Sequence, residues 1–228
     1  MELDDVLRTT GAVREFTDEP VPDEVLYRIL DNARFAPSGG NRQGAHVTVV
    51  RDRALRERLV ALTLPGARRY VAQGSAGEVP WSPVAPTAVS DEAIAATEVP
   101  DRFTNPLLTA AAVLVVTVDL GAVAATDQEL GRIGVIAGGS VYPFAWNILL
   151  AARQEGLGGT FTTMLVAQEP AVRELLAIPE HHALACVIPL GRPVKQPRRL
   201  TRRPVEDFVT LETYAGAPFT AATNDATS

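Results

Sequence analysis

The pattern of apolar positions predicts two strands with both faces buried. One covers residues 112–118 and the other residues 183–190, and each is a nearly continuous run of apolar residues. Such runs are typical of strands that are covered on both sides. A third strand, rich in valine, is predicted at residues 46–50.

Helices are predicted at residues 2–9, 23–35, 52–62 and 137–155, where apolar residues recur at helical spacing or helix boundaries are marked. The last of these is rich in glycine and alanine, and Gly156 is expected to end it. Because the strands are few for a doubly wound parallel sheet, the pattern favours an α+β fold with a mixed sheet covered by helices.

A long irregular stretch separates the two halves of this pattern. Residues 64–106 contain many prolines and little periodicity, which predicts a lid or a partly mobile insertion. Its Tyr70, Trp81 and Phe103 are candidates for stacking on a planar substrate, with buried structural roles as the alternative. The alanine- and threonine-rich tail, residues 215–228, is predicted to be disordered, which leaves a single domain over residues 1–214.

Composition narrows the class of protein. An apolar fraction of 46% fits a globular protein, and a net charge of −6 without a long basic run argues against nucleic-acid binding. No apolar run is long enough to span a membrane, and acidic residues stand where a signal peptide would begin, so a cytoplasmic location is expected. The single Cys186 is interpreted as a buried small hydrophobe.

Several chemical motifs are excluded. Gly156-Leu157-Gly158-Gly159 follows a helix instead of a strand, so it is not a dinucleotide-binding fingerprint. Ser38 lacks the first glycine of a nucleophile elbow. His181 and His182 follow Pro179 in a turn-like stretch without a cysteine or carboxylate partner at ligand spacing, so solvated turn histidines are expected and no metal site. No catalytic side chain is identified.

Two kinds of segment remain as candidate binding elements. The first is the elbow over residues 36–43, where Pro37 ends a helix and Gly39 and Gly40 let the backbone approach a flat polar ligand. An ordinary helix-to-strand connection is the alternative. The second comprises arginines near both ends of the chain, because guanidinium groups match the oxygens of a phosphate monoester. Solvation at the surface is their alternative.

Together these segments resemble the FMN-dependent nitroreductase superfamily. The resemblance rests on Val13-Arg14-Glu15-Phe16, on residues 36–43, on residues 147–158 and on residues 200–205, in this order. Phe161-Thr162-Thr163-Met164-Leu165, with the arginine-proline ending, is similar to the iodotyrosine deiodinase-like branch. The resemblance implies a three-layer α/β/α sandwich with a mixed, mainly antiparallel sheet. It also implies a homodimer with FMN at the interface and a C-terminal arm that reaches the partner subunit.

The resemblance also implies which residues contact the cofactor. Arg14 and Arg202 would hold the FMN phosphate, and Ser38 and Gly39 would line the flavin or its ribityl chain. The Phe161–Thr163 segment would face the ring, with a threonine near flavin N5. The implied cofactor-binding set is Arg14, Ser38, Gly39, Asn41, Phe161, Thr162, Thr163, Arg202 and Arg203.

The chain departs from the family at three places. Thr10 and Ala12 stand where many members have an arginine and a serine. Compensation by Arg8 or the C-terminal arginines is one expectation, and weaker binding of FMN is the alternative. Residues 64–106 contain no lysine, which makes iodotyrosine a poor candidate substrate because the deiodinases use a lysine in their lid.

The implied function is reduction of a flat acceptor, a nitroaromatic or a quinone, by NADPH or NADH in a ping-pong exchange at FMN. Three alternatives stay open: a flavin-dependent reductive dehalogenase, an oxidase, and a non-catalytic flavin-binding protein. A fourth alternative involves no flavin: an interaction domain whose arginines are solvated at the surface.

Overall fold

Four strands form one sheet in the order β1-β2-β4-β3 in the computed structural model of the chain, which describes residues 1–221. The strands are β1 (Ala45–Val50), β2 (Ala112–Asp119), β3 (Gly158–Gly159) and β4 (His182–Gly191). All three strand pairings are antiparallel, and a single parallel bridge joins Ala12 to Gly159. The mixed, mainly antiparallel sheet predicted from the sequence is confirmed.

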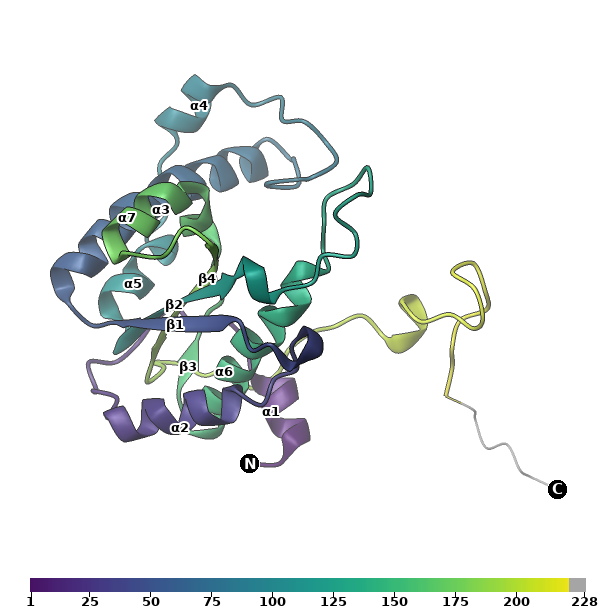
Figure 1. Cartoon of the computed structure of the whole chain (residues 1–228), viewed down its shortest axis with the longest axis horizontal. Helices are drawn as coiled ribbons and strands as arrows, with labels where there is room; N and C mark the ends of the chain where they lie inside the picture. The colour runs from purple at the N-terminus through teal and green to yellow at the C-terminus, as the bar shows by residue number, and fades with distance from the viewer. Residues whose placement is uncertain (222–228) are drawn as a thin grey trace.

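Helices cover both faces of this sheet (Figure 1). One face packs against α2 (Asp23–Ala33) and α6 (Tyr142–Gln154), with α1 (Leu3–Thr9) beside α6. The other face packs against α3 (Arg53–Ser75), α5 (Asn105–Thr109) and α7 (Glu169–Leu176), and α4 (Asp91–Ala96) contacts α3. The result is the three-layer α+β sandwich expected from the sequence. Among the described residues, no helix combines the length and the apolar character that crossing a membrane requires.

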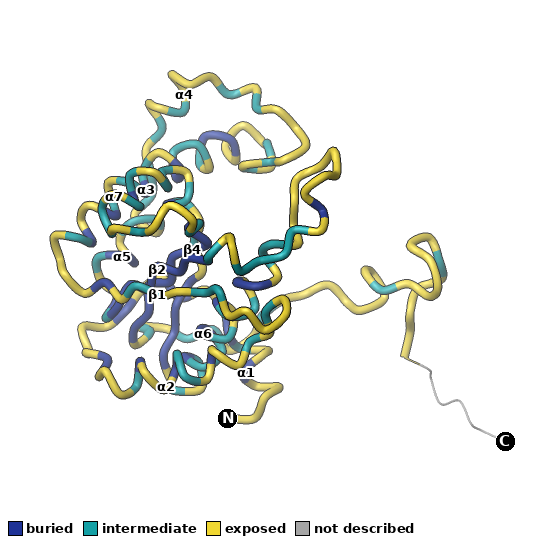
Figure 2. The backbone as a smooth tube through the Cα atoms, viewed as in Figure 1, coloured by how far each residue is buried: buried dark blue, intermediate teal, exposed yellow. Residues whose placement is uncertain are grey.

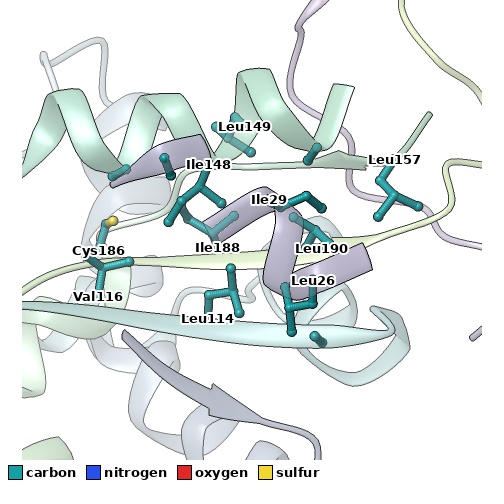
Figure 3. Close-up of a cluster of buried hydrophobic side chains, with 14 of the residues drawn as sticks. Leu26, Ile29, Leu114, Val116, Ile148, Leu149, Leu157, Cys186, Ile188 and Leu190 are labelled. Carbon is teal, nitrogen blue, oxygen red and sulfur yellow. The ribbon is translucent and has the colours of Figure 1, made fainter. Parts of the chain in front are cut away.

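The two inner strands, β2 and β4, are buried along nearly their whole length (Figure 2). Their side chains contribute to both layers of the core. Leu114 and Val116 of β2 and Ile188 of β4 pack toward α2 and α6 (Figure 3). Val113 and Val187 pack toward α3 and α7. Residues 112–118 are all buried, which confirms that β2 is covered on both faces. Cys186 is fully buried as expected, and burial raises the pKa of its thiol to about 12.

Helix α3 is twice as long as the sequence pattern predicts. It begins at Arg53, where the Asp52 side chain accepts a hydrogen bond from Leu55 N at 2.8 Å, and continues through Pro65 to Ser75. The predicted end near residue 62 is therefore wrong. Proline removes one helical hydrogen bond; packing of the next residue, Gly66, against the backbone of Met164 keeps the helix in place.

Helix α6 begins later than predicted. Residues Ala137–Ser140 form a separate 3₁₀ turn, and α6 starts at Tyr142 with Pro143 in its first turn. The predicted start at residue 137 is wrong because glycines at 138 and 139 favour a turn, whereas proline favours the first turn of a helix. Its end is confirmed, since Gly156 has a left-handed φ of 75°. Helix α2 ends at Ala33, two residues before its predicted end.

The C-terminal segment leaves the body of the molecule (Figure 1). It folds back on itself through hydrogen bonds from Leu211 N to Ala217 O and from Phe219 N to Val209 O, both 2.9 Å. Residues 215–219, the start of the tail predicted to be disordered, lie in this turn. Residues 222–228 lie outside the described part of the chain.

Candidate active site

Arg14 and the Phe161–Thr163 segment line one pocket although they are far apart in sequence. The N-terminal strand-like segment places Arg14 there, because Val13 N donates to Gly159 O at 2.9 Å. Thr162 is fixed on the other side by a pair of backbone hydrogen bonds with Val187, of 3.0 and 2.8 Å. The pocket measures about 170 Å³, and its walls are Arg14, Tyr70, Arg102, Phe103, Pro106, Leu107, Thr160, Phe161, Thr162, Thr163, Met164 and Pro189.

Gly158 and Gly159, just before the Phe161–Thr163 segment, allow neighbouring parts of the chain to pack closely against the backbone. A Cβ atom on Gly158 would lie 2.6 Å from Val13 Cγ2, and one on Gly159 would lie 2.8 Å from Pro189 O. A larger residue at Gly158 would push Val13, and with it Arg14, out of place, whereas one at Gly159 would clash with β4. The sequence Gly158-Gly159 therefore serves packing at the edge of the sheet, in agreement with its exclusion as a dinucleotide fingerprint.

An apolar cavity of about 400 Å³ adjoins this pocket and shares Tyr70, Thr163 and Met164 with it. Trp81 forms part of its wall, held by a hydrogen bond from its Nε1 to Gly66 O (3.2 Å). The guanidinium of Arg69 lies 4.3 Å from the centre of the Trp81 ring. The Tyr70 and Phe103 rings lie 5.7 Å apart. The three aromatic residues singled out in the predicted lid thus line two adjoining hollows.

The elbow over residues 36–43 lies in a different place. It lines a hollow of about 120 Å³ with Ser140 and Phe144 of the α6 region, without Arg14 or the Phe161–Thr163 segment. Gly39 N donates to Ser140 Oγ at 3.1 Å, and Gln43 N donates to Ser38 Oγ at 2.9 Å. The sequence gives no signal for the contribution of Ser140, which depends on the packing of two distant segments.

Local interactions hold the elbow in an unusual backbone conformation. Gly40, Asn41 and Gln43 have left-handed φ angles of 61°, 54° and 53°. Gln43 Nε2 donates to Asn41 Oδ1 at 3.2 Å, so the Asn41 side chain is tied to its own loop. Non-glycine residues in this region cost conformational energy and are found where the surrounding structure fixes a loop for a purpose. The elbow is therefore a preformed surface.

Arg202 and Arg203 lie in a fourth hollow, of about 760 Å³, beside α1. Arg8, Arg198 and Arg199 line the same hollow, with only Asp4 and Asp5 as acidic residues among its walls. Five guanidinium groups around one hollow form a strongly positive site that matches a phosphate. Arg14 is not among its walls, so within one chain the structure does not bring Arg14 and Arg202 together.

The two adjacent histidines have a carboxylate partner after all. Asp119 and His182 are paired across β2 and β4, and ligand atoms of Asp119, His181 and His182 lie within 4.8 Å of one another. His182 is the first residue of β4 and is half-buried, so the expectation of two solvated turn histidines is wrong for it. Sequence spacing missed Asp119 because the pairing of β2 with β4 is non-local.

Fold and pocket together define an α+β oxidoreductase of the nitroreductase type. A model of the nitroreductase family matches residues 7–192, and the chain belongs to this family. The oxygen-insensitive NADPH nitroreductase of Salmonella typhimurium is 30% identical over 205 residues, which cover 89% of this chain and 70% of that protein. The 4-nitrobenzoate reductase of a Nocardioides species is 28% identical, and the match covers 92% of this chain and 89% of that protein.

The fold also matches a solved structure of the branch suggested by the sequence. An oxidized iodotyrosine deiodinase, bound to FMN and 3-iodo-L-tyrosine, superposes with a TM-score of 0.67 and 21% identity. The match covers 93% of this chain and 100% of that chain. The resemblance to the nitroreductase superfamily is confirmed.

Proposed function

We propose that the chain is an FMN-dependent oxidoreductase that takes electrons from NADPH or NADH and reduces a flat acceptor of the nitroaromatic or quinone type. The proposal includes a ping-pong exchange, in which donor and acceptor use the same site in turn, and a homodimer. A cytoplasmic location stays a prediction from the sequence.

The observation that carries the proposal is the pair of adjoining hollows around Thr163. One contains Arg14, Phe161 and backbone N–H groups, and the other is apolar and bordered by Tyr70 and Trp81. A flavin ring needs an apolar support and hydrogen-bond partners at its polar edge, and a planar acceptor needs an open apolar space above the ring. The residues present fit both requirements.

The arginine hollow beside α1 supports the assignment of the phosphate site. We propose that Arg202 binds the FMN phosphate, with Arg203 and Arg8 nearby. Arg8 and Arg14 flank the short segment that runs from this hollow to the pocket of Phe161, so a ligand along that segment would meet guanidinium groups at both ends. Arg8 thereby compensates for Thr10 at the position where many members have an arginine.

The separation of the elbow from Arg14 favours a site made by two subunits. Ser38 lines the elbow hollow, and neither it nor its loop neighbours Gly39 and Asn41 line the pocket of Phe161 in the same chain. We propose that they contact the flavin bound to the partner subunit. The extended C-terminal segment exposes Phe208, Leu211 and Tyr214, which suits an arm that packs against a partner.

When bound, FMN supplies the two-electron chemistry, and the protein supplies orientation and control of access. Arg14 holds a negative or electron-rich edge of the cofactor. Thr162 offers its hydroxyl group beside it, and Thr163 offers its hydroxyl and N–H groups, since the N–H of Thr162 is bound to Val187 O. Trp81 and Met164 exclude water from the acceptor side. No side chain of the pocket is assigned as a general acid or base.

The experiment that tests the proposal is an absorption spectrum of the purified protein before and after incubation with FMN and gel filtration. Bound-flavin bands that NADPH or NADH bleaches without oxygen, and that a nitroaromatic or quinone restores, are the expected result. Restoration by oxygen alone would favour an oxidase, and release of halide from a halogenated phenol would favour a dehalogenase. A protein with bands that neither nucleotide bleaches would be a flavin-binding protein, and one that stays colourless would overturn the proposal.

Replacement of Arg202 tests the phosphate assignment. Arg202→Ala is expected to weaken FMN binding by about 1.5–3 kcal/mol, because it removes a charge-assisted hydrogen bond. Fluorescence titration with FMN measures this change. Arg53→Ala, which removes an exposed arginine paired with Glu57 on α3, is the matched control and should leave the affinity unchanged. Equal FMN affinities of Arg202→Ala and the unaltered protein would refute the assignment.

A further inference from the structure

All three histidines of the chain gather at one end of the sheet. His46 lies at the start of β1, and His181 and His182 lie at the start of β4. The ring centres of His46 and His182 are 6.2 Å apart, and those of His181 and His182 are 4.8 Å apart. The end of β2 adds Asp119 to this group.

Three of these four side chains are close enough to share one ion. The ligand atoms of Asp119, His181 and His182 all lie within 4.8 Å of one another. A Zn²⁺ ion with bonds of about 2.0–2.2 Å separates its ligands by about 3.5 Å, so small side-chain rotations would bring them into contact with it. None of the three lines the hollows of the candidate active site.

Hydrogen bonds orient two of the three groups. Asp119 Oδ1 accepts a hydrogen bond from Gly121 N at 2.8 Å, which fixes the carboxylate and leaves its second oxygen available. Thr117 Oγ1 lies 3.2 Å from His182 Nδ1, which leaves Nε2 for an ion. Such outer hydrogen bonds set the tautomer and the direction of metal-binding histidines.

The backbone holds the third residue against the same strand end. Leu120 N donates to His181 O at 2.9 Å, directly after Asp119. His181 itself is exposed, whereas Asp119 and His182 are half-buried. The cluster therefore has two fixed groups against the protein and one group open to solvent, through which an ion can enter.

We propose that Asp119, His181 and His182 form a binding site for a divalent transition-metal ion of the Zn²⁺ type. Two imidazoles and one carboxylate suit Zn²⁺ and its neighbours, whereas Mg²⁺ and Ca²⁺ favour oxygen ligands alone. A water molecule completes the tetrahedron. The ion joins the end of β2 to the start of β4, so its binding stabilises the folded chain. The site is independent of FMN.

The test is isothermal titration of protein without a polyhistidine tag, freed of metal with a chelator, with Zn²⁺ alone. One ion per chain is expected, together with a higher melting temperature in the presence of Zn²⁺. His181→Gln and Asp119→Asn should each abolish both effects; asparagine can still accept the hydrogen bond from Gly121.

Two further variants separate a built site from unspecific binding to imidazole. His46→Gln removes the third histidine without touching any of the three ligands, and it should change the affinity less than about threefold. Thr117→Val keeps the shape of a buried side chain but removes the hydrogen bond to His182, and a loss of about tenfold in affinity is expected. The proposal is overturned if His181→Gln still binds as the unaltered protein does, if His46→Gln costs as much as His181→Gln, or if Zn²⁺ does not bind.

Discussion

Arg56 joins the end of β1 to the start of β2 from its place on α3. Its guanidinium donates to Val50 O, Ala110 O and Ala111 O, at distances of 2.6–3.2 Å, and only 6% of the residue is exposed. Burial lowers its pKa, because the charged form loses hydration. Four hydrogen bonds from this one side chain therefore tie the three carbonyl groups to α3.

We expect Arg56→Met to lower the free energy of unfolding by about 3 kcal/mol, since it leaves buried carbonyl groups unsatisfied while keeping most of the volume. Urea denaturation measures this change. Arg53→Met is the matched control from the same helix: Arg53 is 65% exposed in its ion pair with Glu57, and its loss should cost no more than about 0.5 kcal/mol. Similar midpoints for both variants would show that the buried hydrogen bonds of Arg56 contribute little.

At the scale of elements, α3 depends on Gly66 for its contact with the segment after Thr163. A Cβ atom there would lie 2.2 Å from Met164 O, so Gly66→Ala must displace one of the two backbones. The expected loss is about 1–3 kcal/mol of stability, measured by thermal or urea denaturation. Gly74→Ala in the same helix meets its nearest atom, Pro80 Cγ, at 3.7 Å and should be neutral or stabilising by up to about 1 kcal/mol. Equal effects of the two variants would contradict this account.

The loop after β2 is organised by Asp127, which is 4% exposed. Its Oδ2 accepts hydrogen bonds from Val135 N at 2.7 Å and from Arg132 Nη1 at 2.9 Å. Two hydrogen bonds hold the pKa of the Asp127 carboxyl below its usual value. The one from Val135 N has the larger effect, and the one from Arg132 has the next largest. A lowered pKa means that the disordered loop binds the proton more readily than the ordered loop does.

Lowering the pH should therefore destabilise the ordered conformation of this loop, whereas raising it above neutrality should not. Its stabilisation by Asp127 is complete above the ordinary carboxyl pKa of about 4 and is lost as the pH falls through the lowered value. The amide signal of Val135 in nuclear magnetic resonance should keep its folded position at pH 5 and move only at more acidic pH. Asp127→Ala should lose that position at neutral pH, whereas Glu129→Gln, an exposed neighbour, should keep it. An Asp127→Ala spectrum with the folded Val135 signal would contradict the assignment.

The elements that the sequence predicts well are those with a purely local signal. Residues 112–118 and 183–190 are continuous apolar runs, and both strands lie within a residue or two of the predicted bounds. Helix α3 was underestimated because Pro65 is a local breaker that a non-local contact overrides. Within one chain Arg14 lies in the pocket of Phe161 and not beside Arg202, with which the family resemblance grouped it at the phosphate. The cause of this position, the hydrogen bond between Val13 and Gly159, joins distant segments. Asp119 beside His182 could not be predicted for the same reason.

At the scale of the whole molecule, the proposed homodimer makes a prediction about mixed subunits. Arg14→Glu and Gly39→Trp change exposed residues, and each is expected to abolish flavin-dependent activity on its own. If Arg14 and Gly39 of one site come from different subunits, a mixed dimer contains one intact site. Coexpression of the two variants should then restore about a quarter of the unaltered activity, because about half of the dimers are mixed and each has one site of two.

The measurement is acceptor-dependent oxidation of NADPH or NADH by the coexpressed pair, with each variant alone as a control. Size-exclusion chromatography with light scattering should give twice the mass of one chain for all three preparations. Dimers of the correct mass without restored activity would place Arg14 and Gly39 in the same subunit's site, and a monomeric mass would refute the homodimer itself.

The position of β2 in the sheet also determines which strand edge of the nascent chain stays unpaired during translation. β1 leaves the ribosome first and can pair with one edge of β2, but the partner of the other edge is β4, close to the end of the chain. Until His182–Gly191 has been translated, the buried residues of β2 face solvent along an open edge that other nascent chains can pair with. Translation that stalls between these strands would leave an aggregation-prone fragment, so steady synthesis or a chaperone matters more for this fold than for one whose strands pair in order.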